Sequence, residues 1–190
     1  MPIRSETLDV IERSVKQIIR QAYPKEKIEL IIISDDEATY AEKIKHVVEN
    51  LAKNTIHLKF IWRENPKGKK AGALNEGLRN AIGKYIVTID ADTWLPEDYI
   101  IKIISYLENE KNVVAAISDI TPYNKEKEFG KIQVAAWSFL KKTIFWGRQN
   151  LGFTIPVVGM CSAIKKAVLE EIGGWDESIK RKKKVVRFIE

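Results

Sequence analysis

Tyr85-Ile86-Val87-Thr88-Ile89-Asp90-Ala91-Asp92 is the stretch of this chain that decides its fold. Its first five residues are apolar, β-branched or aromatic, a pattern that predicts a buried strand. Two carboxylates follow where this strand ends, and ligands of open α/β sheets bind beyond the carboxyl ends of the strands. Asp90 and Asp92 are therefore candidate ligands of a divalent cation, Mg²⁺ or Mn²⁺. A simple turn is the alternative explanation for these two residues.

The composition is typical of one globular domain. The chain has 190 residues, of which 45% are hydrophobic and 31% charged, enough for a single core. Its only cysteine, Cys161, excludes an intramolecular disulfide framework and suits a reducing compartment. The sequence has neither a secretory signal pattern nor an apolar run long enough to span a membrane. These features predict a cytoplasmic location.

The net charge is +6, and much of it lies in a basic run, residues 180–187. A solvated tail is the first interpretation of this run, an anionic membrane surface the second and nucleic acid the third. No helix-turn-helix, zinc or RNP pattern accompanies the run, so no nucleic-acid partner is expected. We therefore expect a domain over residues 1–178 and a basic C-terminal tail over residues 179–190.

Helix and strand patterns alternate along the chain. Short apolar runs predict strands at residues 28–33, 57–62, 85–89, 113–117 and 157–163. Apolar residues at helical spacing predict helices at residues 8–22, 40–51, 71–82, 96–107 and 165–172, and a long one within 125–146. This alternation predicts an α/β domain whose mainly parallel sheet is covered by helices on both faces.

Ser34-Asp35-Asp36 places a second acidic pair at the end of another predicted strand. The carboxyl ends of parallel strands meet at one edge of a sheet, so the two acidic pairs should line the same crevice. A carboxylate that does not bind the metal can accept hydrogen bonds from a nucleobase N–H or a ribose hydroxyl. Two acidic strand ends favour a ligand site over two unrelated turns.

Two glycine-containing segments complete the set. Gly68-Lys69-Lys70 opens the predicted helix before the Asp90 strand, where lysines can face anionic phosphates. A flexible, solvated loop is the alternative. In Gly173-Gly174-Trp175-Asp176-Glu177, the glycines end a helix and a tight turn presents the Trp. That ring can stack on a sugar or be buried in the core.

Together, these segments resemble the family 2 glycosyltransferases, nucleotide-sugar-dependent enzymes with a GT-A fold. Pro2-Ile3-Arg4-Ser5-Glu6 is similar to the P-x-x-N-E segment after the family's first strand, and Gln21-Ala22-Tyr23-Pro24 to its Q-x-Y-P. Ser34-Asp35-Asp36 resembles D-D-G/S, the stretch from Lys70 to Asn75 resembles K-x-x-A-L-N, and Asp90-Ala91-Asp92 matches the D-x-D motif. The acceptor-side stretch, residues 159–177, ends like the family's G-G-F/W-D/E.

The resemblance implies an inverting, metal-dependent transfer of a sugar from a nucleotide diphosphate donor to an acceptor hydroxyl on a glycan, lipid or protein. It implies Mn²⁺ or Mg²⁺ on Asp90 and Asp92. The nucleotide-sugar-binding residues that it implies are Pro2, Arg4, Glu6, Asp35, Asp36, Lys70, Asn75, Asp90 and Ala91. No general base is identified, although Asp176 and Glu177 are the acids nearest to its expected place.

Two departures from the family pattern lead to a further expectation. Members have an apolar strand before the segment that corresponds to Pro2–Glu6, whereas this sequence begins at Met1-Pro2. Members also have an E-D motif, which contains the general base, after the Gly-Gly-Trp turn, and this sequence has no such motif there. The Q-x-x-R-W motif of processive members is also absent from this sequence. We therefore expect an unpaired strand edge, nucleotide and metal binding, and slow turnover. A catalytically impaired nucleotide-sugar-binding module and a nucleotidyltransferase are the alternative functions.

The predicted long helix is both apolar and basic. Its residues Val134, Trp137, Leu140, Lys141, Ile144, Phe145 and Trp146 are typical of an interfacial helix, which predicts peripheral membrane association. The alternative is that its aromatic residues belong to the core and its lysines are solvated.

Overall fold

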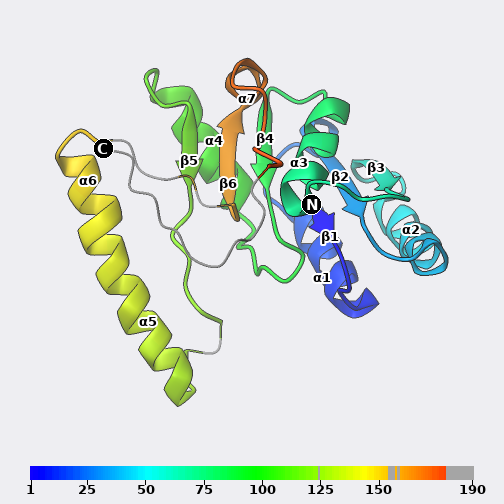
Figure 1. Ribbon diagram of the computed structural model, residues 1–190, viewed down its shortest axis with the longest axis horizontal. Coiled ribbons are helices and arrows are strands. Elements are labelled where there is room, and N and C mark those ends of the chain that lie inside the picture. Colours follow the sequence, from blue (N-terminus) through cyan, green and yellow to red (C-terminus); the bar gives the residue numbers. More distant parts are fainter. Residues whose placement is uncertain (124, 154–156, 158, 179–190) are drawn as a thin grey trace.

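The computed structural model describes residues 1–123, 125–153, 157 and 159–178. Within these ranges, six strands form two three-stranded sheets, with the orders β1-β2-β3 and β4-β6-β5. Helices precede or follow most of the strands, and the two sheets lie next to each other (Figure 1). The α/β fold expected from the sequence is therefore confirmed. The predicted basic tail, residues 179–190, lies outside the described residues.

The first sheet is wholly parallel. It consists of β1 (Pro2–Ile3), β2 (Glu29–Ser34) and β3 (His57–Trp62), with Pro2 opposite Ile33 and Glu29 opposite His57. The connections between these strands are α1 (Leu8–Ile19), η1 (Lys25–Lys27) and α2 (Ala38–Ala52). The sequence placed Pro2 after a first strand, whereas here Pro2 is itself in β1. Proline is accepted there because the first residue of a strand need not donate to the ladder.

The second sheet is antiparallel. It contains β4 (Tyr85–Thr88), β5 (Ala115–Ile117) and β6 (Ser162–Lys165), and β6 runs antiparallel to both of its neighbours. The mainly parallel sheet expected from the sequence is thus limited to β1–β3. The predicted strand at 157–163 also starts late, at Ser162. The preceding Cys161 has a positive φ of 48°, which interrupts an extended backbone.

Helices cover both faces of the sheets. One face packs on α1, α2 and α4 (Tyr99–Asn109), and the other on α3 (Lys69–Asn80) and α7 (Lys166–Glu171). Successive residues of β2 point to opposite faces, as a strand requires. Ile32 therefore joins the large core cluster, whereas Ile33 meets α3, where a Cβ on Gly77 would lie 3.1 Å from Ile33 Cδ1.

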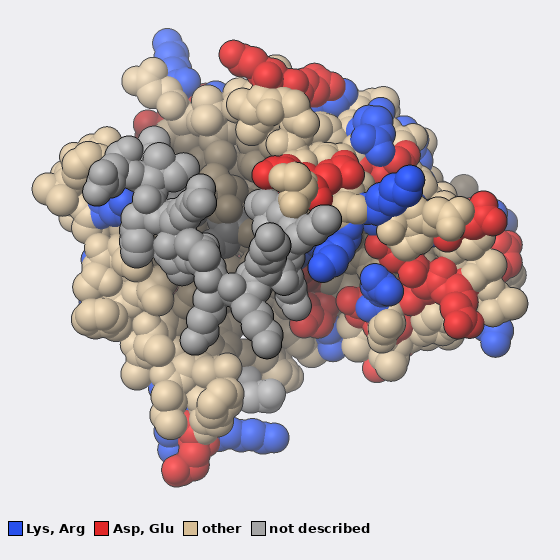
Figure 2. All heavy atoms as spheres, viewed as in Figure 1, with Lys and Arg blue, Asp and Glu red and all other residues tan. Residues whose placement is uncertain are grey.

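A long helical segment stands apart from the sheets (Figure 1). It comprises α5 (Glu128–Leu140), the π-helical η2 (Lys141–Trp146) and α6 (Gly147–Asn150). Its large apolar side chains are mostly exposed, and on the face that Figure 2 shows the visible part of this segment is mainly uncharged, with charged residues at its lower end. Phe145 is buried, but Leu140, Ile144 and Trp146 are exposed, so these three do not belong to the core. No helix in the described ranges is long and apolar enough to cross a bilayer.

The amino group of Met1 is buried between the two sheets. Its nitrogen donates a hydrogen bond of 2.7 Å to the carbonyl of Ile31, and this bond continues the β1–β2 ladder beyond the Pro2–Ile33 pair. Burial disfavours the charged form and lowers the pKa of this amine from 8.0 to about 5, against the opposing effect of Asp90. Between about pH 5 and pH 8, the amine is therefore mainly neutral in the folded protein and mainly protonated in the unfolded chain.

This difference predicts a pH dependence of stability. Between pH 5 and pH 8 the unfolded chain binds a proton that the folded protein does not, so the free energy of unfolding should rise with pH. The expected slope is about 1.4 kcal/mol per pH unit at most. Urea denaturation across this range measures it. The N-acetylated protein, which lacks the amine, is the control, and equal slopes for the two forms would contradict the prediction.

Candidate functional site

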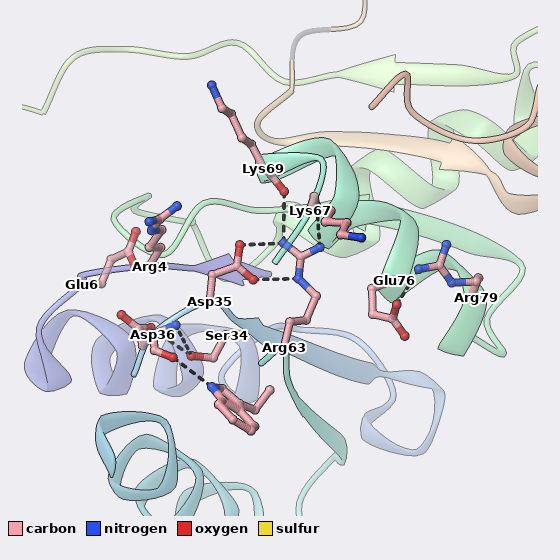
Figure 3. Close-up of polar contacts among 11 residues, drawn as sticks. Arg4, Glu6, Ser34, Asp35, Asp36, Arg63, Lys67, Lys69, Glu76 and Arg79 are labelled. Atoms are coloured by element: carbon pink, nitrogen blue, oxygen red, sulfur yellow. Dashed lines mark hydrogen bonds and ion pairs between the residues drawn. The ribbon is translucent and has the colours of Figure 1, made fainter. Parts of the chain in front are cut away.

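Charged side chains converge where β1, β2 and β3 end (Figure 3). Glu6 belongs to this group, because its carboxyl is close enough to Asp36 and Asp92 for both charges to act on it. Burial, followed by these two acids, raises the pKa of Glu6 despite a hydrogen bond from the Arg4 N–H. The acidic ends of β2 and β4 are thus brought to one edge, as the sequence suggested.

Asp36 is held by the two strand ends beside it. Its Oδ1 accepts a hydrogen bond of 2.7 Å from the Ser5 N–H, and its Oδ2 accepts one of 2.9 Å from the Ser34 hydroxyl. Its carbonyl accepts from the Trp62 indole at 2.9 Å. Each carboxylate oxygen keeps a second lone pair. Asp36 is therefore rigidly placed and still able to accept a hydrogen bond from a ligand.

Asp35 is instead occupied by Arg63, the residue that follows β3. The guanidinium grips the carboxylate with two bonds, Nε to Oδ1 at 2.7 Å and Nη2 to Oδ2 at 2.6 Å (Figure 3). Only 7% of the Asp35 side chain and 12% of the Arg63 side chain are exposed. Arg63 is not among the site residues expected from the sequence. A cation directly after a strand, at the edge that carries the acidic pairs, was the available signal.

Arg63 also holds the loop that leads into α3. Its Nη1 donates to the Lys67 carbonyl at 3.0 Å and its Nη2 to the Lys69 carbonyl at 3.2 Å. Glycine at position 72 makes this arrangement possible, because a Cβ there would lie 2.0 Å from the Lys67 oxygen and 2.9 Å from Arg63 Nη1. The largely buried Arg63 guanidinium therefore fixes the loop before α3, which was expected to face a phosphate.

Lys70, in the first turn of α3, reaches across to the Asp90–Asp92 segment. Its ammonium lies 2.5 Å from Asp90 Oδ1, and this pair is partly exposed. Asp92 is exposed, whereas Ala91 is buried and its carbonyl accepts a hydrogen bond of 2.7 Å from the Ser14 hydroxyl. Asp90 and Asp92 thus lie in a turn after β4, closed by a hydrogen bond of 3.1 Å from the Thr93 N–H to the Asp90 carbonyl, and the buried residue between them anchors this turn to α1.

The backbone is strained around this edge. Four non-glycine residues in the described ranges have positive φ, and three of them, Ser5, Lys69 and Cys161, lie at this edge, next to Asp36, Lys70 and Asp90. Such conformations are costly and cluster at functional sites. Burial, and to a lesser extent Asp90 and Asp92, raises the pKa of the Cys161 thiol, which keeps it neutral.

Asn75 does not point to this edge. Its amide nitrogen donates to the Trp175 carbonyl and to Glu177 Oε1, both at 2.8 Å, and its oxygen accepts from the Trp175 N–H at 2.8 Å. Gly174 allows the contact, since a Cβ there would lie 2.4 Å from Asn75 Oδ1. Asn75 therefore holds the Gly-Gly-Trp turn against α3. Trp175 is partly buried and packs against the small core cluster that contains Leu78.

The remaining candidates have simple placements. Pro2 is a strand residue, and the Arg4 side chain is exposed beside Glu6. Asp176 is exposed, and hydrogen bonds from Ser178 lower its pKa. Its charge is therefore stabilised by local contacts, which makes it a weaker base.

The donor set fits a hard divalent cation that shares its ligands with a substrate. Asp90 and Asp92 supply carboxylate oxygens, and Lys70 already places a positive charge on Asp90. No group of three or more His, Cys, Asp or Glu residues able to hold a metal occurs in the described part of the chain. Mg²⁺ commonly binds through only one or two carboxylates and completes its shell with water and phosphate oxygens.

Similarities to known proteins extend over nearly the whole chain. The chain is 31% identical over 179 residues to a probable glycosyltransferase of Sulfolobus acidocaldarius, covering 93% of this chain and 38% of that protein. The mannosyltransferase PcManGT of Pyrobaculum calidifontis, solved with GDP-Man and Mn²⁺, has a TM-score of 0.67 at 23% identity, covering 94% of this chain and 46% of that one.

A third similarity is to residues 1–349 of TarS from S. aureus in complex with UDP, with a TM-score of 0.62 at 13% identity. It covers 95% of this chain and 50% of that one. The chain thus spans half or less of each of these three proteins. The likeness to the two solved structures confirms the expected GT-A fold. Because the model of glycosyl transferase family 2 matches residues 1–173, the chain belongs to that family.

Proposed function

We propose that this chain forms the donor-binding part of a glycosyltransferase, which transfers a sugar from a nucleotide diphosphate to an acceptor hydroxyl. The observation that carries the proposal is the meeting of Asp36, Lys70, Asp90 and Asp92 at one sheet edge of a family 2 chain. PcManGT was solved with GDP-Man and TarS with UDP, which supports a nucleotide sugar as the ligand class.

In this proposal the nucleoside binds at the end of β2 and the diphosphate at the start of α3. Asp36 has fixed carboxylate oxygens that can accept from a base N–H or a ribose hydroxyl. Lys70, at the start of α3, is placed for the diphosphate, where the helix dipole adds to its charge. Arg63 acts indirectly by holding Asp35 and the loop before Lys70.

Asp90 and Asp92 are the residues that would hold Mn²⁺ or Mg²⁺. A divalent ion bound there would neutralise the charge that develops on the departing diphosphate. Lys70 pairs with Asp90 in the structure, and it would be free to turn to a phosphate once another cation engages that carboxylate. Asp92 is exposed and forms no ion pair with another described residue, so a metal ion could bind it without first displacing a lysine.

The proposed displacement inverts the anomeric centre and needs a carboxylate to take the acceptor proton. Asp176 and Glu177 are poor candidates, because Ser178 stabilises the charge of the first and Asn75 donates to the second. The chain on its own should therefore bind donor and turn over slowly. Family membership disfavours a nucleotidyltransferase, and release of sugar and nucleoside diphosphate rather than pyrophosphate would distinguish the two.

The first prediction concerns the metal. Binding of UDP or GDP, measured by calorimetry, should be at least about tenfold tighter with Mn²⁺ than in EDTA, a difference of about 1.4 kcal/mol. Asp92→Asn should remove most of this increment, because it deletes a charged metal ligand. Asp98→Asn, at the start of α4, is the matched control and should retain it. Full Mn²⁺ dependence in an Asp90→Asn, Asp92→Asn double variant would refute the assignment.

The second prediction separates the two aspartates after β2. Asp36→Asn should weaken nucleoside diphosphate binding by about 1–3 kcal/mol, the usual cost of a lost hydrogen-bond acceptor, and leave pyrophosphate binding unchanged. Asp35→Asn should weaken both ligands, because it releases Arg63 and the loop before Lys70. It should also destabilise the fold by about 3–5 kcal/mol, since one charge of a buried pair is left alone. Identical binding profiles for the two variants would disprove this division of roles.

We also propose that the helical segment α5–α6 lies on an anionic membrane surface. Residues 127–150 contain five basic residues and one acidic residue, Glu128. Exposed apolar side chains, including Phe129, Ile132 and Phe139, lie between these charges. A basic helix with large apolar residues on its surface is typical of an interfacial helix.

The third prediction tests this surface by flotation with phosphatidylglycerol vesicles. Binding should be strong at low salt and weaken at high salt, since each basic residue near the surface contributes about 1 kcal/mol. Replacing both Ile132 and Phe139 with Glu should abolish it. Ile82→Glu is the control, because Ile82 is as exposed, at 75%, but lies outside this segment. Equal flotation of all three proteins would argue against the membrane surface.

A further inference from the structure

Two exposed aromatic rings lie beside the Asp90–Asp92 turn. Trp94 follows this turn, and Tyr123 belongs to the segment after β5. Their ring centroids are 4.9 Å apart and their planes differ by only 3°, so the rings are stacked. Trp94 is 51% exposed and Tyr123 is 69% exposed. Apolar residues scattered singly over a surface need no explanation, whereas a joined patch such as this one marks an interaction site.

Arg13 of α1 fixes this stack beside the candidate metal ligands. Its guanidinium carbon lies 4.5 Å from the centroid of the Trp94 ring, and its Nη2 donates to the Asp92 carbonyl at 3.4 Å. Its Nε is buried and has no hydrogen-bond partner within the described residues. A guanidinium over the face of a Trp ring is attracted by the negative charge of that face. The Trp94 ring and the Asp92 backbone are therefore held by the same cation.

The stack and Lys70 approach the two carboxylates from opposite sides. Lys70 reaches Asp90 from α3, on one face of the sheets, whereas Arg13 reaches the Asp92 backbone from α1, on the other. In the proposed function, Lys70 lies on the side of the diphosphate. A displacement that inverts the anomeric centre brings the acceptor hydroxyl to the face opposite the leaving group. The acceptor is therefore expected on the side of Arg13 and the stack.

The chemistry of the stack favours a saccharide over a lipid chain. One face of a pyranose ring consists largely of C–H groups, whose small positive charges complement the negative face of an aromatic ring. Its hydroxyls point outward and remain in water, which an open surface permits. A lipid chain gains most where it is fully removed from water. Both rings are more than half exposed, so they suit the sugar better.

We propose that Trp94 and Tyr123 form an acceptor platform and that the acceptor is a saccharide, whose pyranose ring stacks on the open aromatic surface. The proposal rests on the proposed function, because it names the acceptor class of the same site. The two residues take the role that the sequence suggested for Trp175. That ring is less suited, because it is partly buried and packs against the small core cluster.

The test is an NMR titration with the methyl glycosides of glucose, mannose and N-acetylglucosamine, with and without UDP or GDP and Mn²⁺. At least one glycoside should bind and shift the Trp94 indole N–H signal, which a Trp94→Phe variant assigns. Tyr123→Ala should weaken this binding at least about fivefold, because the stacking surface is lost. Tyr123→Phe keeps the ring and should bind like the unchanged protein. Tyr106→Ala removes an exposed tyrosine of α4 and is the matched control.

Donor binding separates this proposal from the proposed function. Tyr123→Ala should retain Mn²⁺-dependent binding of UDP or GDP. If the unchanged protein binds nucleotide but none of the glycosides, the platform is refuted and the proposed function stands. If it binds a glycoside through Tyr123 but no nucleotide, the proposed function and the acceptor role both fail.

Two further results would overturn the platform. An equal loss of glycoside binding in Tyr106→Ala would show that the effect of Tyr123→Ala is not specific to the stack. Octanol that binds as tightly as the glycosides, and depends equally on Tyr123, would show that the surface accepts a lipid chain instead of a sugar.

Discussion

The ion pair between Asp35 and Arg63 is the interaction on which the rest of the site depends. It joins the ends of β2 and β3, and the same guanidinium holds the carbonyls of Lys67 and Lys69. Buried pairs gain little net stability, because desolvation offsets their attraction. This pair instead provides position, since five guanidinium N–H groups in a fixed plane can serve a carboxylate and two carbonyls at once.

The site is rigid where it is built by the backbone and adjustable where it is built by lysine. Asp36 is fixed by the Ser5 N–H and the Ser34 hydroxyl, and the positive φ of Ser5 is the strain that accompanies this contact. Lys70 is different, because a flexible side chain in a partly exposed pair can exchange partners at little cost. This contrast agrees with the proposed function, in which Asp36 would hold the nucleoside and Lys70 would follow the charge on the diphosphate.

Much of the fold could be predicted from local sequence patterns. His57–Trp62 is a strand with the predicted bounds, and the Asp35–Asp36 and Asp90–Asp92 pairs follow β2 and β4, as expected, although these two strands belong to different sheets. Features that depend on distant contacts were missed. The antiparallel course of β6 follows from its partners β4 and β5, and the role of Arg63 follows from a carboxylate 28 positions away in the chain. Asn75 resembled a ligand residue in its motif, although its contacts are about 100 positions away.

The bonds of Asn75 have a mechanical consequence. The short helix α3 carries Lys70 at its start and Asn75 in its second turn, and it moves as one body because its backbone is hydrogen-bonded throughout. A molecule that displaced the Trp175 turn would therefore break the hydrogen bonds to Asn75, on the same helix as Lys70. If binding at the two ends of α3 is coupled, the coupling free energy is the same in both directions. An anion that draws Lys70 away from Asp90 would then change the affinity for a molecule at Trp175 by the same factor. The helix α3 thus links the Trp175 turn to the ion pair between Lys70 and Asp90.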